Sequence, residues 1–151
     1  MPSLDEVIDE WADRVEIHEG PDRFMADFMA LPPMIQPLIA GAWCEYEVSN
    51  GGLHQFFSNS TGVLAPEAIA AFETIGIPDL ATVVRDAAGL FGEPYPRDRE
   101  KREEALEGAL AAVFKTNLSQ LDDRFYSALG DSLEAESTWR VAASAWLART
   151  R

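Results

Sequence analysis

Residues 34–57 have the sequence MIQPLIAGAWCEYEVSNGGLHQFF, and this stretch decides the fold class. Ahead of the glycines, its apolar side chains recur at intervals of three and four residues, as on a helix with one face against a core. These side chains are Met34, Ile35, Leu38, Ile39, Ala42, Trp43 and Tyr46. Pro37 is compatible with a helix only in the first turn. The pattern predicts a helix over 33–48 that the Ser49-Asn50-Gly51-Gly52 turn interrupts.

Two shorter helices are expected before this stretch. Ser3 and Glu6 have the spacing of a capping box, in which each side chain bonds an orphan backbone N–H. The apolar residues that follow lie on one helical stripe: Leu4, Val7, Ile8, Trp11 and Val15. Gly20-Pro21 is expected to end this first helix, and a second is expected from about Asp22 to just before Pro32-Pro33.

The rest of the chain continues the helical pattern. A short apolar segment with Leu53, Phe56 and Phe57 leads to a turn at 59–62, after which Pro66 and Pro78 each open a helix. Three more helices are expected, at 98–114, 119–129 and 131–148. No run alternates apolar and polar residues with the period of two that marks a strand. The sequence therefore predicts an all-α fold, with residues 1–151 forming one compact domain of about seven to eight short helices.

Composition narrows the class of protein. Hydrophobic residues make up 47% of the chain and four are tryptophans, as in a globule with a packed core. No apolar run approaches the roughly 20 residues of a membrane span. The N-terminus lacks the basic start and apolar stretch of a secretory signal, so a cytoplasmic location is expected. Cys44, beside Trp43, is expected to be a buried, unreactive thiol.

Acidic residues dominate the charge and are unevenly placed. The chain has 26 acidic and 12 basic residues, a net charge of −14. Residues 1–27 contribute −7, residues 28–93 contribute −6 and residues 94–151 contribute −1. Such a field repels nucleic acids and anionic membranes and attracts basic surfaces. Direct binding to DNA or to a membrane is therefore not expected, whereas a basic protein partner is.

The acids of the first predicted helix are ordered along it. Asp5, Asp9 and Asp13 form a row, and further acids flank or continue it: Glu6, Glu10, Glu16, Glu19 and Asp22. At about 1.5 Å rise per residue, Asp5 to Glu16 would span roughly 16 Å with about one negative charge per 3 Å. One DNA strand carries about one per 3.4 Å. These eight acids are the candidate partner-binding surface; the alternative is that they only keep the protein soluble.

Catalytic and metal-binding patterns are missing from the sequence. The two histidines, His18 and His54, lie in no catalytic motif. Asp122-Asp123 resembles no metal motif and is expected to complement a helix dipole near a helix start. Gly51-Gly52 lacks the lysine of a phosphate-binding loop. We expect no enzyme activity, no metal and no cofactor. The remaining enzymatic alternative is a pocket of carboxylates near Asn50, Gln55 and Asp122.

The segment Glu47-Val48-Ser49-Asn50-Gly51-Gly52-Leu53-His54-Gln55-Phe56-Phe57-Ser58-Asn59-Ser60-Thr61-Gly62 resembles the signature of the DNA-mimic-protein-like family. The matching positions are Asn50, Gly51, Gly52, Gln55, Phe56, Phe57, Asn59 and Gly62; the aromatic that usually follows the glycines is Leu53 here. Ile75-Gly76 and residues 121–126 also resemble the family. The resemblance covers roughly residues 35–130.

The resemblance implies an all-helical bacterial protein that occupies the DNA-binding surface of a transcription factor and so relieves repression. The signature itself is interpreted as mainly structural, with glycines at positive φ and buried phenylalanines. Two functions stay open. One is DNA mimicry by the acidic surface, and the other is a regulatory module that binds proteins through a groove lined by Asn50, Gln55 and Asn59. The oligomeric state is also open, a homodimer included.

Overall fold

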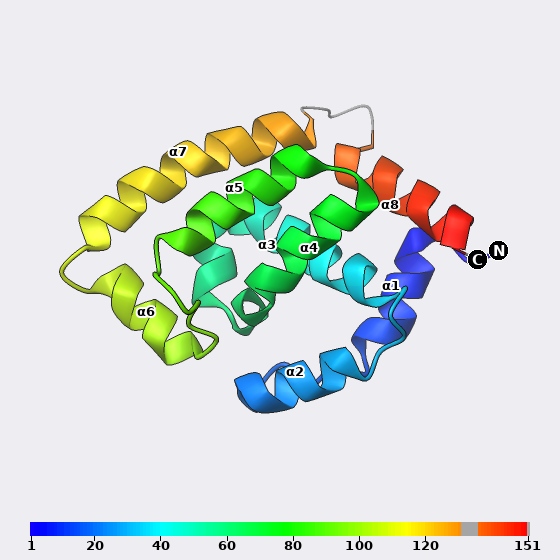
Figure 1. The fold of residues 1–151 in the computed structure, drawn as a ribbon, viewed down its shortest axis with the longest axis horizontal. Coiled ribbons are helices and arrows are strands. Elements are labelled where there is room, and N and C mark those ends of the chain that lie inside the picture. Colours follow the sequence, from blue (N-terminus) through cyan, green and yellow to red (C-terminus); the bar gives the residue numbers. More distant parts are fainter. Residues whose placement is uncertain (131–135, 151) are drawn as a thin grey trace.

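The computed structural model describes residues 1–130 and 136–150. These residues form eight α-helices and one 3-10 helix, with no strand among them, so the predicted all-α class and the number of helices are confirmed (Figure 1). The elements are α1 (Leu4–Ala12), α2 (Pro21–Met29), α3 (Gln36–Ser58), η1 (Ser60–Leu64), α4 (Ala65–Ile75), α5 (Pro78–Gly89), α6 (Arg99–Glu107), α7 (Ala111–Leu129) and α8 (Thr138–Thr150).

The helices are arranged around α3. The helices α4, α6 and α7 pack on it, α5 packs between α4 and α7, and α1 and α8 pack on its N-terminal half and on each other. Figure 1 shows α6 and the start of α7 at one end of the molecule, with α1, α8 and both chain termini at the other. Among the helices that are described, none is both long enough and apolar enough to cross a bilayer.

The core follows the apolar pattern of α3. Leu38, Ile39 and Cys44 are almost fully buried, and burial raises the pKa of the Cys44 thiol, so the predicted buried cysteine is confirmed. The Trp139 ring of α8 lies against Gly41, where no side chain separates the two helices. The same ring meets Phe72 of α4 edge to face at 5.6 Å between centroids. One tryptophan thus joins α8 to α3 and α4.

The first helix is shorter than predicted. Its capping box is present, but α1 ends at Ala12 and not at Gly20-Pro21. Backbone bonds from Arg14 to Trp11 and from Val15 to Ala12 form a tight turn, which brings Val15 into the core. The next N–H, that of Glu16, binds the Asp27 carboxylate at 3.0 Å. The burial of Val15 in the core therefore accompanies an earlier end of the helix than the apolar pattern predicts.

The prediction of one continuous helix over 98–114 was wrong, because the chain leaves helical geometry at Gly108. Gly108 has φ −83° and ψ −154°, which ends α6 and starts a turn into α7. A Cβ on Gly108 would lie 2.7 Å from the carbonyl oxygen of Glu104, so the turn requires glycine. The predicted 119–129 helix is the second half of α7. The predicted 131–148 helix corresponds to α8, although residues 131–135 lie outside the described residues.

The predicted interruption at the two glycines is present inside α3. Gly51 (φ −153°, ψ 21°) and Gly52 (φ 78°, ψ 178°) both leave helical geometry, so α3 consists of two helical segments joined by a kink. The apolar segment after the glycines is the second of these, and η1 occupies the turn expected before Pro66. The family-like signature therefore spans the kink and the start of η1.

Candidate functional site

The kink in α3 is held by a residue that lies far along the sequence. Asp122 of α7 accepts the backbone N–H of Leu53 at 2.7 Å and thereby caps the second helical segment. A Cβ on Gly52 would lie 2.8 Å from Asp122 Oδ2. The prediction that Asp122 and Asp123 lie near the start of their own helix was wrong. Asp122 instead caps the start of another helical segment, the second segment of α3. Burial raises the pKa of Asp122, and the Leu53 N–H opposes this shift.

The two signature glycines meet different needs. Gly52 adopts positive φ, as expected, but Gly51 does not, so that expectation was wrong for Gly51. A Cβ on Gly51 would instead collide with the amide oxygen of Gln55. Gly62 is similarly confined, since a Cβ there would lie 2.6 Å from the carbonyl oxygen of Phe56. Close packing against neighbours explains glycine at both of these positions.

The three signature amides form one cluster around Glu47. Gln55 Nε2 and Asn59 Nδ2 donate to Glu47 Oε2 at 3.0 and 2.7 Å. Asn50 Nδ2 donates to Gln55 Oε1 at 3.1 Å. The amides therefore bind to one another and to a carboxylate of the same helix, an arrangement that fixes the chain on both sides of the kink.

The signature phenylalanines belong to the core. Phe56 and Phe57 have no exposed surface, as the structural interpretation expected. Phe57 lies in an aromatic cluster, 4.9 Å from the Phe91 ring and 6.3 Å from the Tyr95 ring between centroids. The Tyr95 hydroxyl donates to the Gly62 carbonyl at 2.7 Å, which ties the same cluster to the end of the signature.

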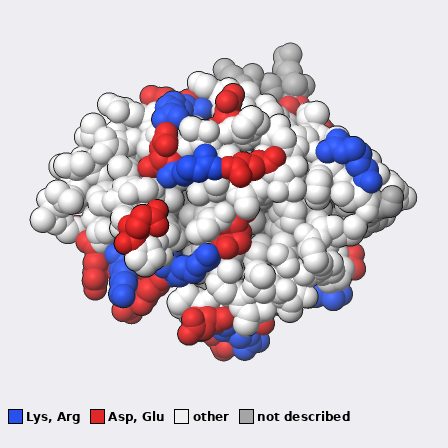
Figure 2. Space-filling model, viewed as in Figure 1, with Lys and Arg blue, Asp and Glu red and all other residues white. Residues whose placement is uncertain are grey.

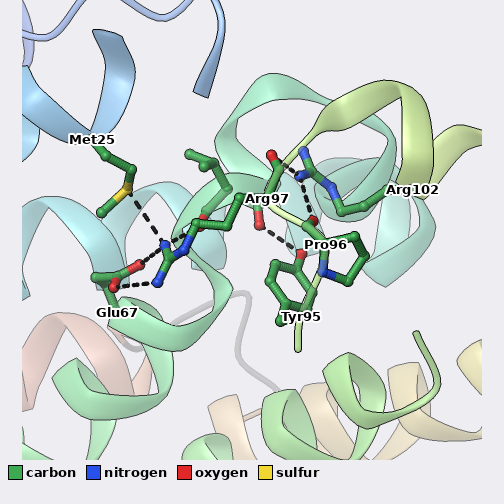
Figure 3. A network of polar contacts seen from close by, with 8 residues as sticks. Met25, Glu67, Tyr95, Pro96, Arg97 and Arg102 are labelled. Atoms are coloured by element: carbon green, nitrogen blue, oxygen red, sulfur yellow. Dashed lines mark hydrogen bonds and ion pairs between the residues drawn. The ribbon is translucent and has the colours of Figure 1, made fainter. Parts of the chain in front are cut away.

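A buried arginine, missed from the sequence, anchors the C-terminal end of the signature. Arg102 of α6 has no exposed surface. Its guanidinium donates to the carbonyl oxygens of Phe57, Asn59, Pro96 and Arg97 at 2.6–3.1 Å. Figure 3 shows Arg102 beside Pro96 and Arg97. Burial lowers the pKa of Arg102. The charged residues of this helix are mixed in sign, a pattern typical of a solvent-exposed face. Arg102 lies four residues before the apolar Leu106 and therefore on the same face of the helix, a spacing that could have indicated its burial.

Substituting Gly52 tests whether the kink limits stability. We expect Gly52→Ala to lower the free energy of unfolding by about 2–3 kcal/mol, since its backbone angles are essentially restricted to glycine and its Cβ would displace Asp122. Urea unfolding followed by circular dichroism measures this. The matched control is Gly89→Ala in α5, where a Cβ meets nothing within 4 Å. Equal effects of the two substitutions would contradict the assignment.

The predicted acidic surface does not form one helical row. Asp5, Glu6, Asp9 and Glu10 lie on the exposed side of α1 and Asp13 caps its C-terminal end. Because α1 ends early, Glu16 and Glu19 lie in the connection to α2, and Asp22 lies in the first turn of α2. The 16 Å helical row from Asp5 to Glu16 was therefore wrong, although seven of the eight acids are exposed and Glu16 is half-buried.

Arginines neutralise part of this surface. Arg140 binds Asp5 at 2.7 Å, and Arg23 binds both Glu19 and Asp27. Glu6 is engaged in the capping box. In the portion of the chain that the structure describes, no ion pair involves Asp9, Glu10, Asp13, Glu16 or Asp22. Asp9, Glu10 and Asp13 thus form a set of exposed carboxylates at α1 without a described ion pair, beside Arg14, which lies over the Trp11 ring.

The face shown in Figure 2 carries charges of both signs. Lys and Arg side chains lie beside Asp and Glu side chains there, and much of the surface carries neither. Two ion pairs, Arg124–Asp86 and Arg85–Glu73, connect neighbouring helices through exposed side chains. The net charge of −14 is therefore not spread as a uniform negative coat.

The family model described as DMP19-like protein matches residues 29–149. The chain belongs to the DMP19-like protein family. This confirms the resemblance drawn from the signature, and the match extends beyond the expected 35–130 to include α8. The acidic residues 5–22 precede the matched region, so the DMP19-like core consists of α3 to α8 together with the end of α2. No curated protein and no solved structure matches the chain.

Within residues 1–130 and 136–150, no group of three or more His, Cys, Asp or Glu side chains is placed to hold a metal ion. The two histidines lie apart from each other. His54 Nδ1 lies 3.2 Å from the Ser58 hydroxyl, and His18 lies on the exposed α1–α2 connection. The pocket of carboxylates considered near Asn50 and Gln55 is reduced to Glu47 and Asp122, each of which binds backbone or amide N–H groups. In this DMP19-like chain both carboxylates support the kink.

Proposed function

We propose that this protein acts as a DNA mimic, whose acidic α1 occupies the basic DNA-binding surface of a partner such as a transcription factor. The observation that carries the proposal is the set of exposed carboxylates Asp9, Glu10 and Asp13, which form no ion pair with the described residues, within a segment 1–27 of charge −7. Membership of the DMP19-like family supports a mimic role for the chain, and the placement on α1 rests on the exposed acids, because α1 precedes the matched residues 29–149. A basic groove that binds phosphates would be attracted by the same electrostatic field.

The alternative function uses a groove beside the Asn50-Gly51-Gly52 turn. Recognition there would require amide groups that are free to bind a partner. Asn50, Gln55 and Asn59 instead form hydrogen bonds with one another and with Glu47. This arrangement favours the acidic surface over the signature amides as the binding site.

Neutralising the three carboxylates is the direct test. We expect Asp9→Asn, Glu10→Gln and Asp13→Asn together to weaken binding to the captured DNA-binding protein by about tenfold or more at low salt, which corresponds to about 1.4 kcal/mol. The protein is immobilised, a lysate of its source cell is passed over it at low and high salt, and the affinity of the recovered protein is then measured by surface plasmon resonance. DNA that carries the partner's operator should compete for binding.

The control neutralises three exposed acids elsewhere, Glu100, Glu104 and Glu107 of α6, and should leave most of the affinity intact. Both variants must keep the helical circular dichroism of the original protein. Capture that ignores salt, operator DNA and the α1 substitutions would sink the mimicry proposal. That outcome would favour binding through the turn and leave the acidic residues a solubilising role.

A further inference from the structure

Three arginines meet at one small cavity, in a chain that has only 12 basic residues. The cavity has a volume of about 120 Å³ and lies where the α1–α2 connection approaches η1 and the start of α6. Arg97, Arg99 and Arg102 line it from one side, with His18 and Ser60 among the other lining residues. Within the described chain, none of the lining residues is acidic.

Two of the three arginines around this cavity are paired with carboxylates. Glu67 binds Arg97 through two hydrogen bonds of 2.7 and 3.0 Å, and Glu103 binds Arg99 at 3.2 Å. Figure 3 shows Arg97 turned toward Glu67, whereas the Arg102 guanidinium is turned toward carbonyl oxygens. No described carboxylate binds Arg102. A buried charge that has only dipoles around it favours a nearby anion.

Glu16 is the other carboxylate bonded to a lining residue, because it accepts the backbone N–H of His18 at 2.9 Å. It does not line the cavity itself. With Glu16 counted, three carboxylates lie beside the three arginines, so the described residues give the cavity no surplus of positive charge. An anion would be held by directional hydrogen bonds more than by net charge.

Donors for such bonds are present on two sides. The bonds formed by Arg99 with described residues, to the Ser58 carbonyl and to Glu103, both use its Nε, which leaves its two Nη groups available. Across the cavity lies the start of α2, where Pro21 at the first helical position has no N–H, so the first-turn donors are the N–H groups of Asp22 and Arg23. The first-turn N–H groups of a helix point outward from that end and favour negative charge.

We propose that this cavity binds a phosphate group, either as free inorganic phosphate or as the end of a small phosphate monoester. The cavity volume of about 120 Å³ is large enough for a tetrahedral oxyanion. Arg99 and Ser60 supply side-chain donors, Arg102 supplies fixed positive charge, and the bound group connects α2 to α6. The site is separate from the acidic face of α1.

Isothermal titration calorimetry at constant ionic strength tests this proposal on the intact protein. Sodium phosphate and glycerol 3-phosphate are titrated in turn, with sodium chloride as the reference salt. We expect saturable binding of at least one phosphate compound and none of chloride. Arg99→Gln should weaken that binding about tenfold, the loss of one charge-assisted hydrogen bond. Binding of inorganic phosphate alone identifies the free ion, and comparable binding of the monoester identifies a metabolite.

The matched control is Arg124→Gln, which removes an exposed arginine that is likewise ion-paired, on α7. It should leave the dissociation constant unchanged within twofold. A second variant, Ser60→Ala, should weaken binding without removing charge. The proposal is overturned if neither phosphate compound binds more tightly than chloride, or if the Arg99 and Arg124 variants weaken binding equally.

Discussion

Arg102→Ala is expected to lower the free energy of unfolding by about 3–5 kcal/mol, the combined cost of the cavity that it leaves and of the buried carbonyl oxygens that lose their donor. The guanidinium is fully buried and satisfies four carbonyl oxygens from three segments: the end of α3, the residue that follows it and the chain before α6. Alanine would leave these carbonyls buried without donors and would leave a cavity. For a protein with a stability of about 5–15 kcal/mol, such a loss is a large fraction of the total.

Lys101→Ala provides the control, because Lys101 is the exposed neighbour on the same helix and its loss should cost less than about 0.5 kcal/mol. Arg102→Lys should recover little stability, since one ammonium has three donors at a single point and cannot replace a planar fork that reaches four acceptors. Urea unfolding of the three variants compares them directly. If lysine restored full stability, positive charge alone would explain Arg102, and the hydrogen-bond geometry would not matter.

Trp139→Ala is expected to lower the free energy of unfolding by about 3–5 kcal/mol, as for other fully buried tryptophans. The ring is 1% exposed and fills the space above Gly41, where α8 approaches α3, and it packs edge to face on Phe72. Removing it would leave a large cavity at the meeting point of three helices. Because α8 also packs on α1, α3, α4 and α7, the whole chain should still unfold in one transition.

Differential scanning calorimetry together with circular dichroism measures both the loss and the cooperativity. Trp146→Ala is the matched control on α8, because Trp146 is only partly buried at the edge of the core. It should cost clearly less than Trp139→Ala. Two separate unfolding transitions in the Trp139 variant would contradict the prediction that residues 1–151 form a single domain.

The sequence by itself determined the helical class, the N-terminal cap and the position of the kink. These features depend on local chemistry. Ser3 and Glu6 bond backbone groups within one turn, and apolar spacing in residues 34–46 follows the period of one helix. At the kink, Gly52 has the positive φ that a glycine at a helix break predicts. The family signature was recognisable for the same reason, since it lies within one continuous segment.

Only the tertiary structure decided where α1 ends and how its charges are distributed. The turn after Ala12 forms because Val15 enters the core and Asp27, eleven residues beyond Glu16, accepts the Glu16 N–H. Arg140 reaches Asp5 across 135 residues. Arg102 became a core residue because the carbonyls of Phe57 and Asn59, 45 and 43 residues away, accept its N–H groups. Local spacing carries no information on such long-range partners, and these partners determine which charges remain available at the surface.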